Sequence, residues 1–190
     1  MSEKIPMERH NYDVVVIGAG GAGLRAAVEA REAGLRVAII CKSLFGKAHT
    51  VMAEGGIAAS MGNVNDKDGW QVHFRDTMRG GKFLNHYRMA ELHAKEAPDR
   101  VWELELWGAL FDRTGEGKIS QRNFGGHEYP RLAHVGDRTG RDLWIFGTEW
   151  CWKKYHYDDL YYFTQTHIWT SYQQGLRYHC LLCHIVTNLA

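Results

Sequence analysis

The fold is decided by the stretch Tyr12-Asp-Val-Val-Val-Ile-Gly-Ala-Gly-Gly-Ala-Gly-Leu24. Its run from Val14 to Ile17 is continuously apolar and β-branched, which is typical of a strand buried on both faces of a sheet. Gly18, Gly20 and Gly23 follow with G-x-G-x-x-G spacing. In such a turn the first glycine permits a tight bend, the second admits a pyrophosphate, and the third lets the next helix pack closely on the sheet.

The residues on either side of this turn complete a βαβ unit. A helix is predicted from Leu24 to Glu32, and a second strand from Arg36 to Cys41, after Gly34. The helix N-terminus, with its unpaired N–H groups and positive dipole end, would face the phosphates. The sequence therefore predicts an α/β fold of the Rossmann type with a dinucleotide site, the alternative being a glycine-rich turn that only packs.

The residues after the second strand bear on which dinucleotide is bound. An NAD or FAD site usually has Asp or Glu near the end of this strand, on the ribose hydroxyls. Here that place holds Cys41-Lys42-Ser43, which weakens a simple NAD prediction. The following loop, Phe45 to Gly56, contains glycines and a central histidine, His49. Taken alone, a histidine in a loop is most simply a solvated side chain.

Together with its neighbours, this histidine resembles a known family. A His49-Thr50 pair ahead of Ala53-Glu-Gly-Gly56 resembles the flavoprotein subunit of succinate dehydrogenase and fumarate reductase. The resemblance implies a Rossmann-type FAD-binding domain with FAD attached covalently through the imidazole of His49. The cofactor-binding residues that it implies are Gly18, Ala19, Gly20, Gly21, Ala22, Gly23, Lys42, Ser43, His49, Thr50, Ala53, Gly55 and Gly56.

The resemblance continues to Gly140. Gln121-Arg-Asn-Phe-Gly-Gly126 is similar to a family loop whose Phe lies against the dicarboxylate, so Phe124 is a substrate-side candidate, with ordinary core as the alternative. Ala133-His-Val-Gly-Asp-Arg-Thr-Gly140 is similar to a family element that precedes a helix of the flavin domain. Glu54 holds a position that the family places beside the substrate, and Glu there favours fumarate-reductase-like behaviour or a menaquinone-linked enzyme able to run in both directions. The phrases resemble the actinobacterial type most.

We expect three segments along the chain. Residues 1–11 form a flexible lead-in, 12–140 the N-terminal and incomplete part of the FAD-binding domain, and 141–190 a tail that does not match the family. Twelve of the 23 aromatic residues lie in this tail. A truncated product with a changed reading frame near Gly140 is the first hypothesis, and a divergent tail with its own packing is the second. The tail's Cys180-Leu-Leu-Cys183-His184 has the c-type haem pattern, but without an export signal we expect no haem or metal.

Composition excludes several classes. The net charge of +1 gives no basic field for nucleic acid, and no apolar run is long enough to span a membrane. The first residues lack the apolar core of a signal peptide. The cysteines have no recognisable disulfide spacing, which favours a reduced compartment. His86 and His93 lie seven apart on one predicted helix, but no further ligand is spaced to complete a metal site.

Further elements are expected between the two halves of the resemblance. The pattern predicts helices at Trp70–Arg79, at His86–Glu96 with Asn85 as N-cap, and at Asp99–Trp107 with Pro98 in its first turn. A hairpin is predicted from strands at 108–112 and 119–124 around a turn at 114–118.

What the resemblance implies for the complete subunit is interconversion of succinate and fumarate, with electrons passing through an iron–sulfur subunit to quinone in membrane anchor subunits. The protein would then be cytoplasmic and peripheral on the inner face of the cell membrane. The family's capping domain, with its proton-transferring Arg, has no counterpart before Gly140, so no catalytic residue is assigned and we expect no turnover by this chain alone. The alternatives are a non-catalytic flavin-binding fragment and another FAD-dependent oxidoreductase, similar to aspartate oxidase.

Overall fold

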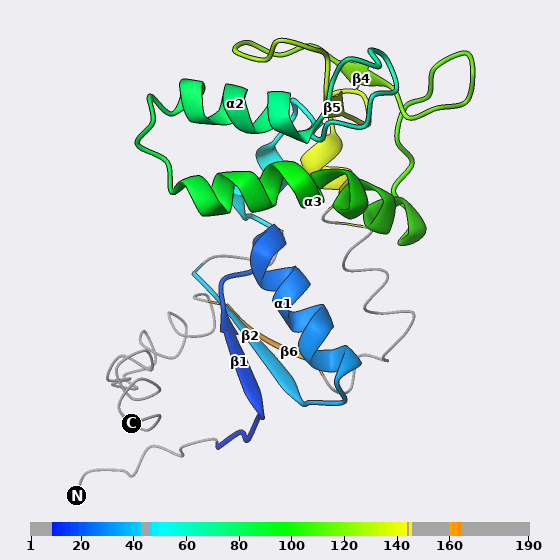
Figure 1. Cartoon of the computed structure of the whole chain (residues 1–190). Helices are drawn as coiled ribbons and strands as arrows, with labels where there is room; N and C mark the ends of the chain where they lie inside the picture. Colours follow the sequence, from blue (N-terminus) through cyan, green and yellow to red (C-terminus); the bar gives the residue numbers. More distant parts are fainter. Residues whose placement is uncertain (1–8, 43–45, 144, 146–159, 165–190) are drawn as a thin grey trace, which may run out of the picture. The chain divides into compact units, whose positions relative to one another are not determined.

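The computed structural model describes residues 9–42, 46–143, 145 and 160–164. They belong to two compact units, one made of residues 1–48 and 155–190 and the other of residues 49–154. Figure 1 shows the helices and strands of each unit.

The first unit contains a parallel three-stranded sheet in the order β1-β2-β6. Strand β1 spans Val14–Ile17, β2 spans Val37–Cys41 and β6 spans Leu160–Thr164. Val14 pairs with Val37, and Val37 pairs with Leu160. The first two strands are the predicted ones, although β2 begins one residue later. Strand β6 was not predicted, because the aromatic tail shows no lasting period of two.

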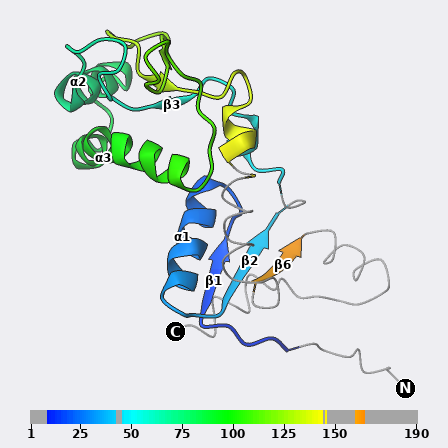
Figure 2. The ribbon, with the colours of Figure 1, turned by 90° about the vertical axis from the view of Figure 1, so that its right-hand side faces the viewer.

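The helix α1, Gly21–Glu32, lies along one face of this sheet (Figure 2). It buries Leu24, Ala27 and Val28, and it begins three residues before the predicted start. The reason is that the last residues of the glycine motif are already helical, with Gly20 at the N-cap. Together these elements form the predicted βαβ unit.

An ion pair fastens the beginnings of β1 and β2 to each other. The Asp13 carboxylate accepts hydrogen bonds from the Arg36 backbone N–H at 2.8 Å and from its guanidinium at 3.2 and 3.1 Å. The Arg36 side chain lowers the pKa of Asp13. Because both side chains are exposed, we expect solvent to screen much of this attraction.

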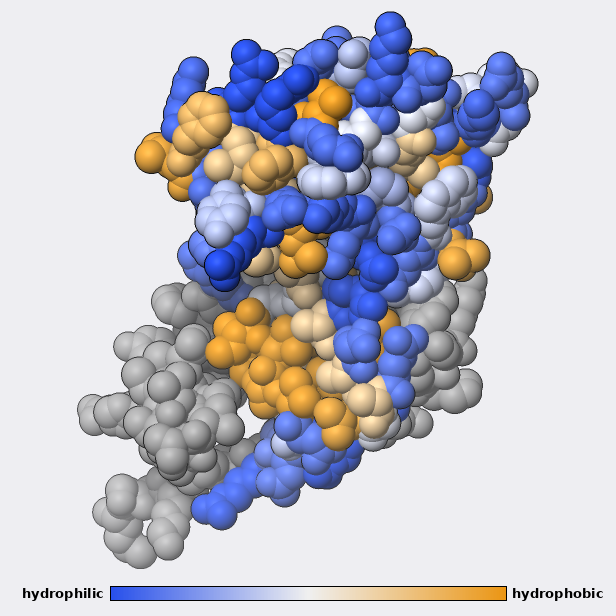
Figure 3. All heavy atoms as spheres, viewed as in Figure 1, coloured by the Kyte–Doolittle hydropathy of each residue, from blue (hydrophilic) through white to orange (hydrophobic). Residues whose placement is uncertain are grey.

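The sheet of the first unit leaves apolar surface uncovered by described residues. Val15 and Ile17 of β1 are exposed, and Figure 3 shows hydrophobic side chains gathered over this region. The continuous apolar run of β1 predicts burial on both faces, and the described residues do not provide it.

The second unit is built on an antiparallel helix pair and a small antiparallel sheet. Helix α2 spans Trp70–Gly80 and α3 spans Tyr87–Leu106. The sheet has the order β3-β5-β4, from Ile57–Ala58, Leu132–Ala133 and Gln121–Arg122. Its apolar core is formed by residues from both parts: Ala59, Ala97, Val101, Ala109, Phe111, Ile119, Ala133 and Val135.

Two expectations about α3 were wrong. A single helix runs through Pro98, where two helices were predicted. Its buried residues Ala90, Ala94, Ala97 and Val101 form one stripe on both sides of the proline, so packing keeps the helix continuous although Pro98 supplies no N–H. The helical spacing of Met89, Leu92 and His93 predicts one stripe of the first of these two helices facing the core, but all three are exposed.

The N-cap of α3 also differs from the prediction. His86, rather than Asn85, occupies that position, and its Nδ1 accepts a hydrogen bond from the Met89 N–H at 3.4 Å. Asn85 instead donates to the carbonyl of Thr77 at 3.3 Å, across the connection between α2 and α3. A histidine can cap a helix because its unprotonated ring nitrogen is an acceptor.

The predicted hairpin is present only as its turn. Thr114 and Lys118 are joined by a backbone hydrogen bond of 2.8 Å, and an isolated bridge links Arg113 with Ile119. Residues 108–112 form no strand, and β4 pairs with β5 instead. The apolar residues of the two predicted strands pack in the core instead, since Ala109, Phe111 and Ile119 are all buried.

A buried polar network accompanies the apolar core. Arg131 is 0% exposed and pairs with Asp68 and Asp76, each at 2.9 Å. His73, also buried, has ring contacts with His93 and His127 at 5.3 and 6.2 Å between centroids. Burial and the nearby Arg131 lower the pKa of His73 to about 4. Within α2, the buried side chains are the polar His73 and Asp76.

Candidate functional site

The glycine turn of the first unit is shaped by backbone crowding. Gly18 has φ +115°, a conformation that residues with a side chain rarely adopt. A Cβ placed on Gly23 would lie 1.9 Å from the carbonyl oxygen of Gly18. The helix can pack this closely on the turn only with glycine at that position, which is the role predicted for it.

The N-terminus of α1 presents no competing negative charge. Its N-cap is Gly20, which has no side chain, and its first turn holds no acidic residue. Ala19 and Leu24 are buried beside it. A helix N-terminus with these properties attracts an anion, so the turn fits the phosphates of a dinucleotide.

At the end of β2 the described residues are Cys41 and Lys42. Cys41 is buried, and that burial raises the pKa of its thiol. Lys42 is exposed and could offer a positive charge to a bound phosphate. Ser43, which was predicted to bind the cofactor with Lys42, lies outside the described residues.

The predicted flavin loop of the second unit starts with a short 3-10 helix, η1, at His49–Met52. His49 itself is exposed. Ala53, Glu54, Gly55 and Gly56 then lead into β3. The histidine is therefore accessible at the start of a segment whose remaining residues are fixed by hydrogen bonds.

One set of these bonds comes from the Asp-Arg-Thr-Gly element. The Gly140 N–H donates to the carbonyl of Ala53 at 2.7 Å, and the Thr139 hydroxyl lies 3.5 Å from the carbonyl of Glu54. A Cβ on Gly140 would lie 1.9 Å from the carbonyl oxygen of Thr50. The two segments that resemble the family most are thus packed directly against each other.

A second set comes from Arg122 of β4. Its guanidinium donates to the carbonyls of Glu54 at 2.6 Å, Gly55 at 2.8 Å and Gly136 at 3.0 Å. It also pairs with the Asp137 carboxylate at 2.8 Å. Arg122 thereby joins the end of the flavin loop to the turn before Thr139.

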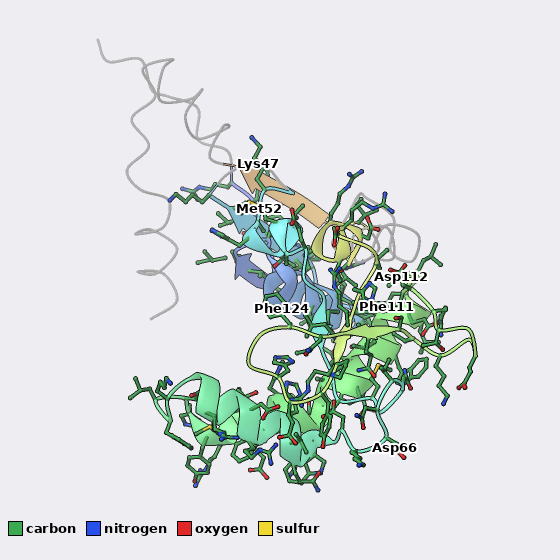
Figure 4. All side chains as sticks on the ribbon, turned by 90° about the horizontal axis from the view of Figure 1, so that it is seen from above. Lys47, Met52, Asp66, Phe111, Asp112 and Phe124 are labelled. Atoms are coloured by element: carbon green, nitrogen blue, oxygen red, sulfur yellow. The ribbon has the colours of Figure 1, made fainter. Side chains whose placement is uncertain are left out.

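Phe124 follows Arg122 on the loop between β4 and β5 (Figure 4). It is 60% exposed, so it is not a core residue of the described part of the chain. Its ring passes 3.8 Å from the position of a Cβ on Gly55. Glu54 is exposed as well. Phe124 therefore lies beside Gly55, the residue that follows Glu54 in the flavin loop.

Sequence reasoning missed two features of this unit. Arg122 belongs to the motif Gln121-Arg-Asn-Phe-Gly-Gly126, in which only Phe124 received a predicted role. The one signal for Arg122 was its charge inside that motif. The buried network around Arg131 gave no local signal, because its members lie at widely separated positions. No group of His, Cys, Asp or Glu within the described ranges could hold a metal ion.

The helices offer no membrane-spanning segment. Among the residues that the structure describes, none of the helices combines the length and the apolar character needed to cross a bilayer. The predicted C-x-x-C-H pattern at residues 180–184 lies outside the described residues.

Comparison with known proteins identifies what the chain is similar to. The family called FAD binding domain matches residues 13–152. The chain is 48% identical over 137 residues to one subunit of the fumarate reductase (CoM/CoB) of Methanothermobacter marburgensis, and the match covers 72% of this chain and 25% of that protein. It is 45% identical over 151 residues to the succinate dehydrogenase flavoprotein subunit of Rickettsia bellii, covering 75% and 25%.

The structural comparison agrees. The solved structure "Mycobacterium smegmatis Sdh1 in complex with UQ1" superposes with a TM-score of 0.77 at 68% sequence identity, covering 83% of this chain and 28% of that chain. The chain thus spans about a quarter of the length of the curated relatives it matches. A Rossmann-type FAD-binding domain, present as its N-terminal portion, is confirmed.

Proposed function

The chain belongs to the FAD-binding-domain family, and on this premise we propose that it is the N-terminal part of the flavoprotein subunit of a succinate dehydrogenase or fumarate reductase. The observation that carries the nucleotide site is the close approach of Gly23 to Gly18, with α1 starting directly behind it. The named relatives, one from a fumarate reductase and one from a succinate dehydrogenase, support the same assignment.

The residues present fit FAD. The cradle of Gly18 to Gly23 would receive the pyrophosphate against the N-terminus of α1, whose N-cap is Gly20 and whose first turn holds no acidic residue. Lys42 and Ser43 follow the second strand and would complete the nucleotide side. FAD, when bound, supplies the redox chemistry, and the chain supplies orientation and electrostatics.

We assign His49 as the covalent attachment point. Its imidazole is exposed on η1, as a group that must reach a ligand atom has to be. The flavin beside it would be lined by Thr50, Ala53, Gly55 and Gly56. The backbone of this loop is held by hydrogen bonds from Arg122 and Gly140 to its carbonyls.

For the complete subunit we propose interconversion of succinate and fumarate. Glu54 and Phe124, both exposed in the second unit, would be next to the substrate. The partners would be membrane anchor subunits together with an iron–sulfur subunit, which would place the protein at the inner face of the cell membrane. No catalytic residue is assigned within this chain.

Two alternatives make different predictions. A non-catalytic flavin-binding fragment would hold FAD without turnover, which we expect for this chain alone. An oxidoreductase similar to aspartate oxidase would hold FAD without a bond to His49.

The attachment can be tested on a denaturing gel viewed for flavin fluorescence in acid. We expect a fluorescent band for the wild-type chain supplied with FAD, and none for His49→Ala. The control is His10→Ala, since His10 is an exposed histidine before β1, and its band should equal the wild type.

The outcomes separate the proposals. Flavin that is released by denaturation from both the wild type and His49→Ala would contradict covalent attachment and favour the aspartate-oxidase-like alternative. Absence of any bound flavin from the folded wild-type chain would contradict the flavin site itself.

A further inference from the structure

Arg122 joins the end of the flavin loop to the turn before Thr139. Its guanidinium holds the carbonyls of Glu54 and Gly55, which follow η1 and His49 in the flavin loop. It lies two residues before Phe124, whose ring rests beside Gly55. It also holds Gly136 and Asp137, next to Thr139 and Gly140, which contact the same loop.

The chemistry of these contacts requires an arginine. Nε donates to Gly55, Nη1 to Asp137, and Nη2 to both Glu54 and Gly136. A guanidinium offers five N–H donors in a fixed plane, whereas a lysine ammonium is a compact charge with three donors at a single atom. A lysine at this position could donate to some of these four acceptors, but it could not hold all of them in the same geometry.

The contacts fall on the backbone of the loop rather than on its side chains. Three of the four acceptors are peptide carbonyls, and the fourth, the Asp137 carboxylate, is largely exposed. The hydrogen bonds from Arg122 to the backbone carbonyls do not involve the side chains of His49 and Glu54, which are exposed. A residue that fixes a loop backbone in this way sets the position of its side chains without contacting their ligands.

From these contacts we propose that Arg122 is a positioning residue for the covalent flavin: it fixes the backbone after η1 so that His49 meets the flavin, and it keeps Phe124 in register with Glu54. This inference rests on the proposed function and adds to it a residue that acts through the loop. The glycine cradle of the first unit contains no Arg122 contact, so non-covalent FAD binding should not depend on it.

Binding and attachment can therefore be measured separately. Total flavin is measured on the native, gel-filtered chain, and covalent flavin on the same sample after acid precipitation. For Arg122→Lys we expect total flavin close to the wild type and a covalent fraction lower by about tenfold, as small displacements of a reacting group can cause. Far-UV circular dichroism and a thermal melt establish that the variant is folded.

Two further variants keep the test decisive. Asp137→Asn is the matched control, since it alters only the exposed carboxylate contact and retains the three carbonyl bonds. It should attach flavin like the wild type. Arg122→Gln retains one amide donor group near the loop and should lose covalent flavin as Arg122→Lys does.

The possible results lead to different conclusions. Equal covalent fractions in wild type, Arg122→Lys and Arg122→Gln would overturn the positioning role. Loss of folding in both Arg122 variants, with bound and covalent flavin falling together, would also overturn it, because the residue would then be needed for the fold. A wild-type chain without covalent flavin would overturn the proposed attachment at His49, and this inference with it.

Discussion

The glycine turn of the first unit and the flavin loop of the second are held in place by different means. The turn is determined locally, because a positive φ at Gly18 and the contact between Gly23 and the Gly18 carbonyl require glycine at both positions. The loop is held by residues far away in sequence, since Arg122 and Gly140 follow Glu54 by more than 60 positions. A motif read along the chain therefore captures the first kind of structure more fully than the second.

The largest loss of stability that we predict comes from disrupting the buried network of Arg131, Asp68 and Asp76 in the second unit. Arg131→Met would leave Asp68 and Asp76 buried without their cation, and we expect the free energy of unfolding to fall by about 3–5 kcal/mol. Urea unfolding followed by circular dichroism measures it. Arg100→Met is the control, because Arg100 and Glu103 form an exposed helical pair whose loss should cost less than about 1 kcal/mol.

A small effect of Arg131→Met, similar to that of Arg100→Met, would show that long-range charge pairing does not determine the second unit. The difference between the two regions would then need another explanation, such as apolar packing alone.

The same network should make the second unit sensitive to acid. His73 has a pKa of about 4 in the folded chain, lowered by burial and by Arg131, His93 and His127, and about 6.5 when unfolded. The unfolded chain therefore binds a proton first as the pH falls. The stability that neutral His73 contributes is complete above pH 6.5 and declines as the pH falls toward 4, by up to about 3 kcal/mol.

The measurement is a series of urea titrations between pH 7.5 and about 4.5 on the wild type and His73→Gln. Other titrating groups are common to both chains, so the difference between their slopes reports His73. Parallel curves for the two chains would contradict the assignment of acid sensitivity to this histidine.

A local test of the first unit is the substitution Gly23→Ala. Its Cβ would meet the Gly18 carbonyl oxygen at 1.9 Å, a backbone atom that cannot move without displacing the turn. We expect a loss of about 2 kcal/mol in stability together with weaker FAD retention. The control is Gly80→Ala at the end of α2, where a Cβ meets nothing within 4 Å, and alanine there should be neutral or slightly stabilising.

If Gly23→Ala retained FAD and stability, the close approach of α1 to the turn would not be required. Loss of stability with unchanged FAD retention would make the glycine motif a packing feature only, which is the alternative that the sequence left open.

The sequence predicted what depends on neighbouring residues. The apolar run of β1, the glycine spacing and the start of α2 follow from local rules, and β1 is found at the predicted bounds. The His49 loop was identified from its resemblance to a family, and the structure adds the contacts that hold it. The attachment itself stays a prediction.

The sequence failed where packing overrides a local preference. Pro98 predicts a helix boundary, but the alanine stripe around it is buried on one continuous helix. A strand is predicted at 108–112, but Ala109 and Phe111 belong to the core without pairing in a sheet. Arg131 could not be placed at all, since no local pattern distinguishes a buried arginine from the exposed ones that are far more common.

The smallest expected effect concerns the start of α3, where sequence and structure name different caps. His86→Ala removes the side-chain acceptor of the Met89 N–H, which also donates to the His86 backbone carbonyl at 3.0 Å, and we expect a loss of about 0.5–1 kcal/mol. Asn85→Ala removes only the contact with the Thr77 carbonyl. Hydrogen exchange of the Met89 amide, followed by NMR, distinguishes the two: it should accelerate in His86→Ala and stay near the wild-type rate in Asn85→Ala. The reverse pattern would restore Asn85 as the cap and show that local capping rules govern the second unit here as they govern the first.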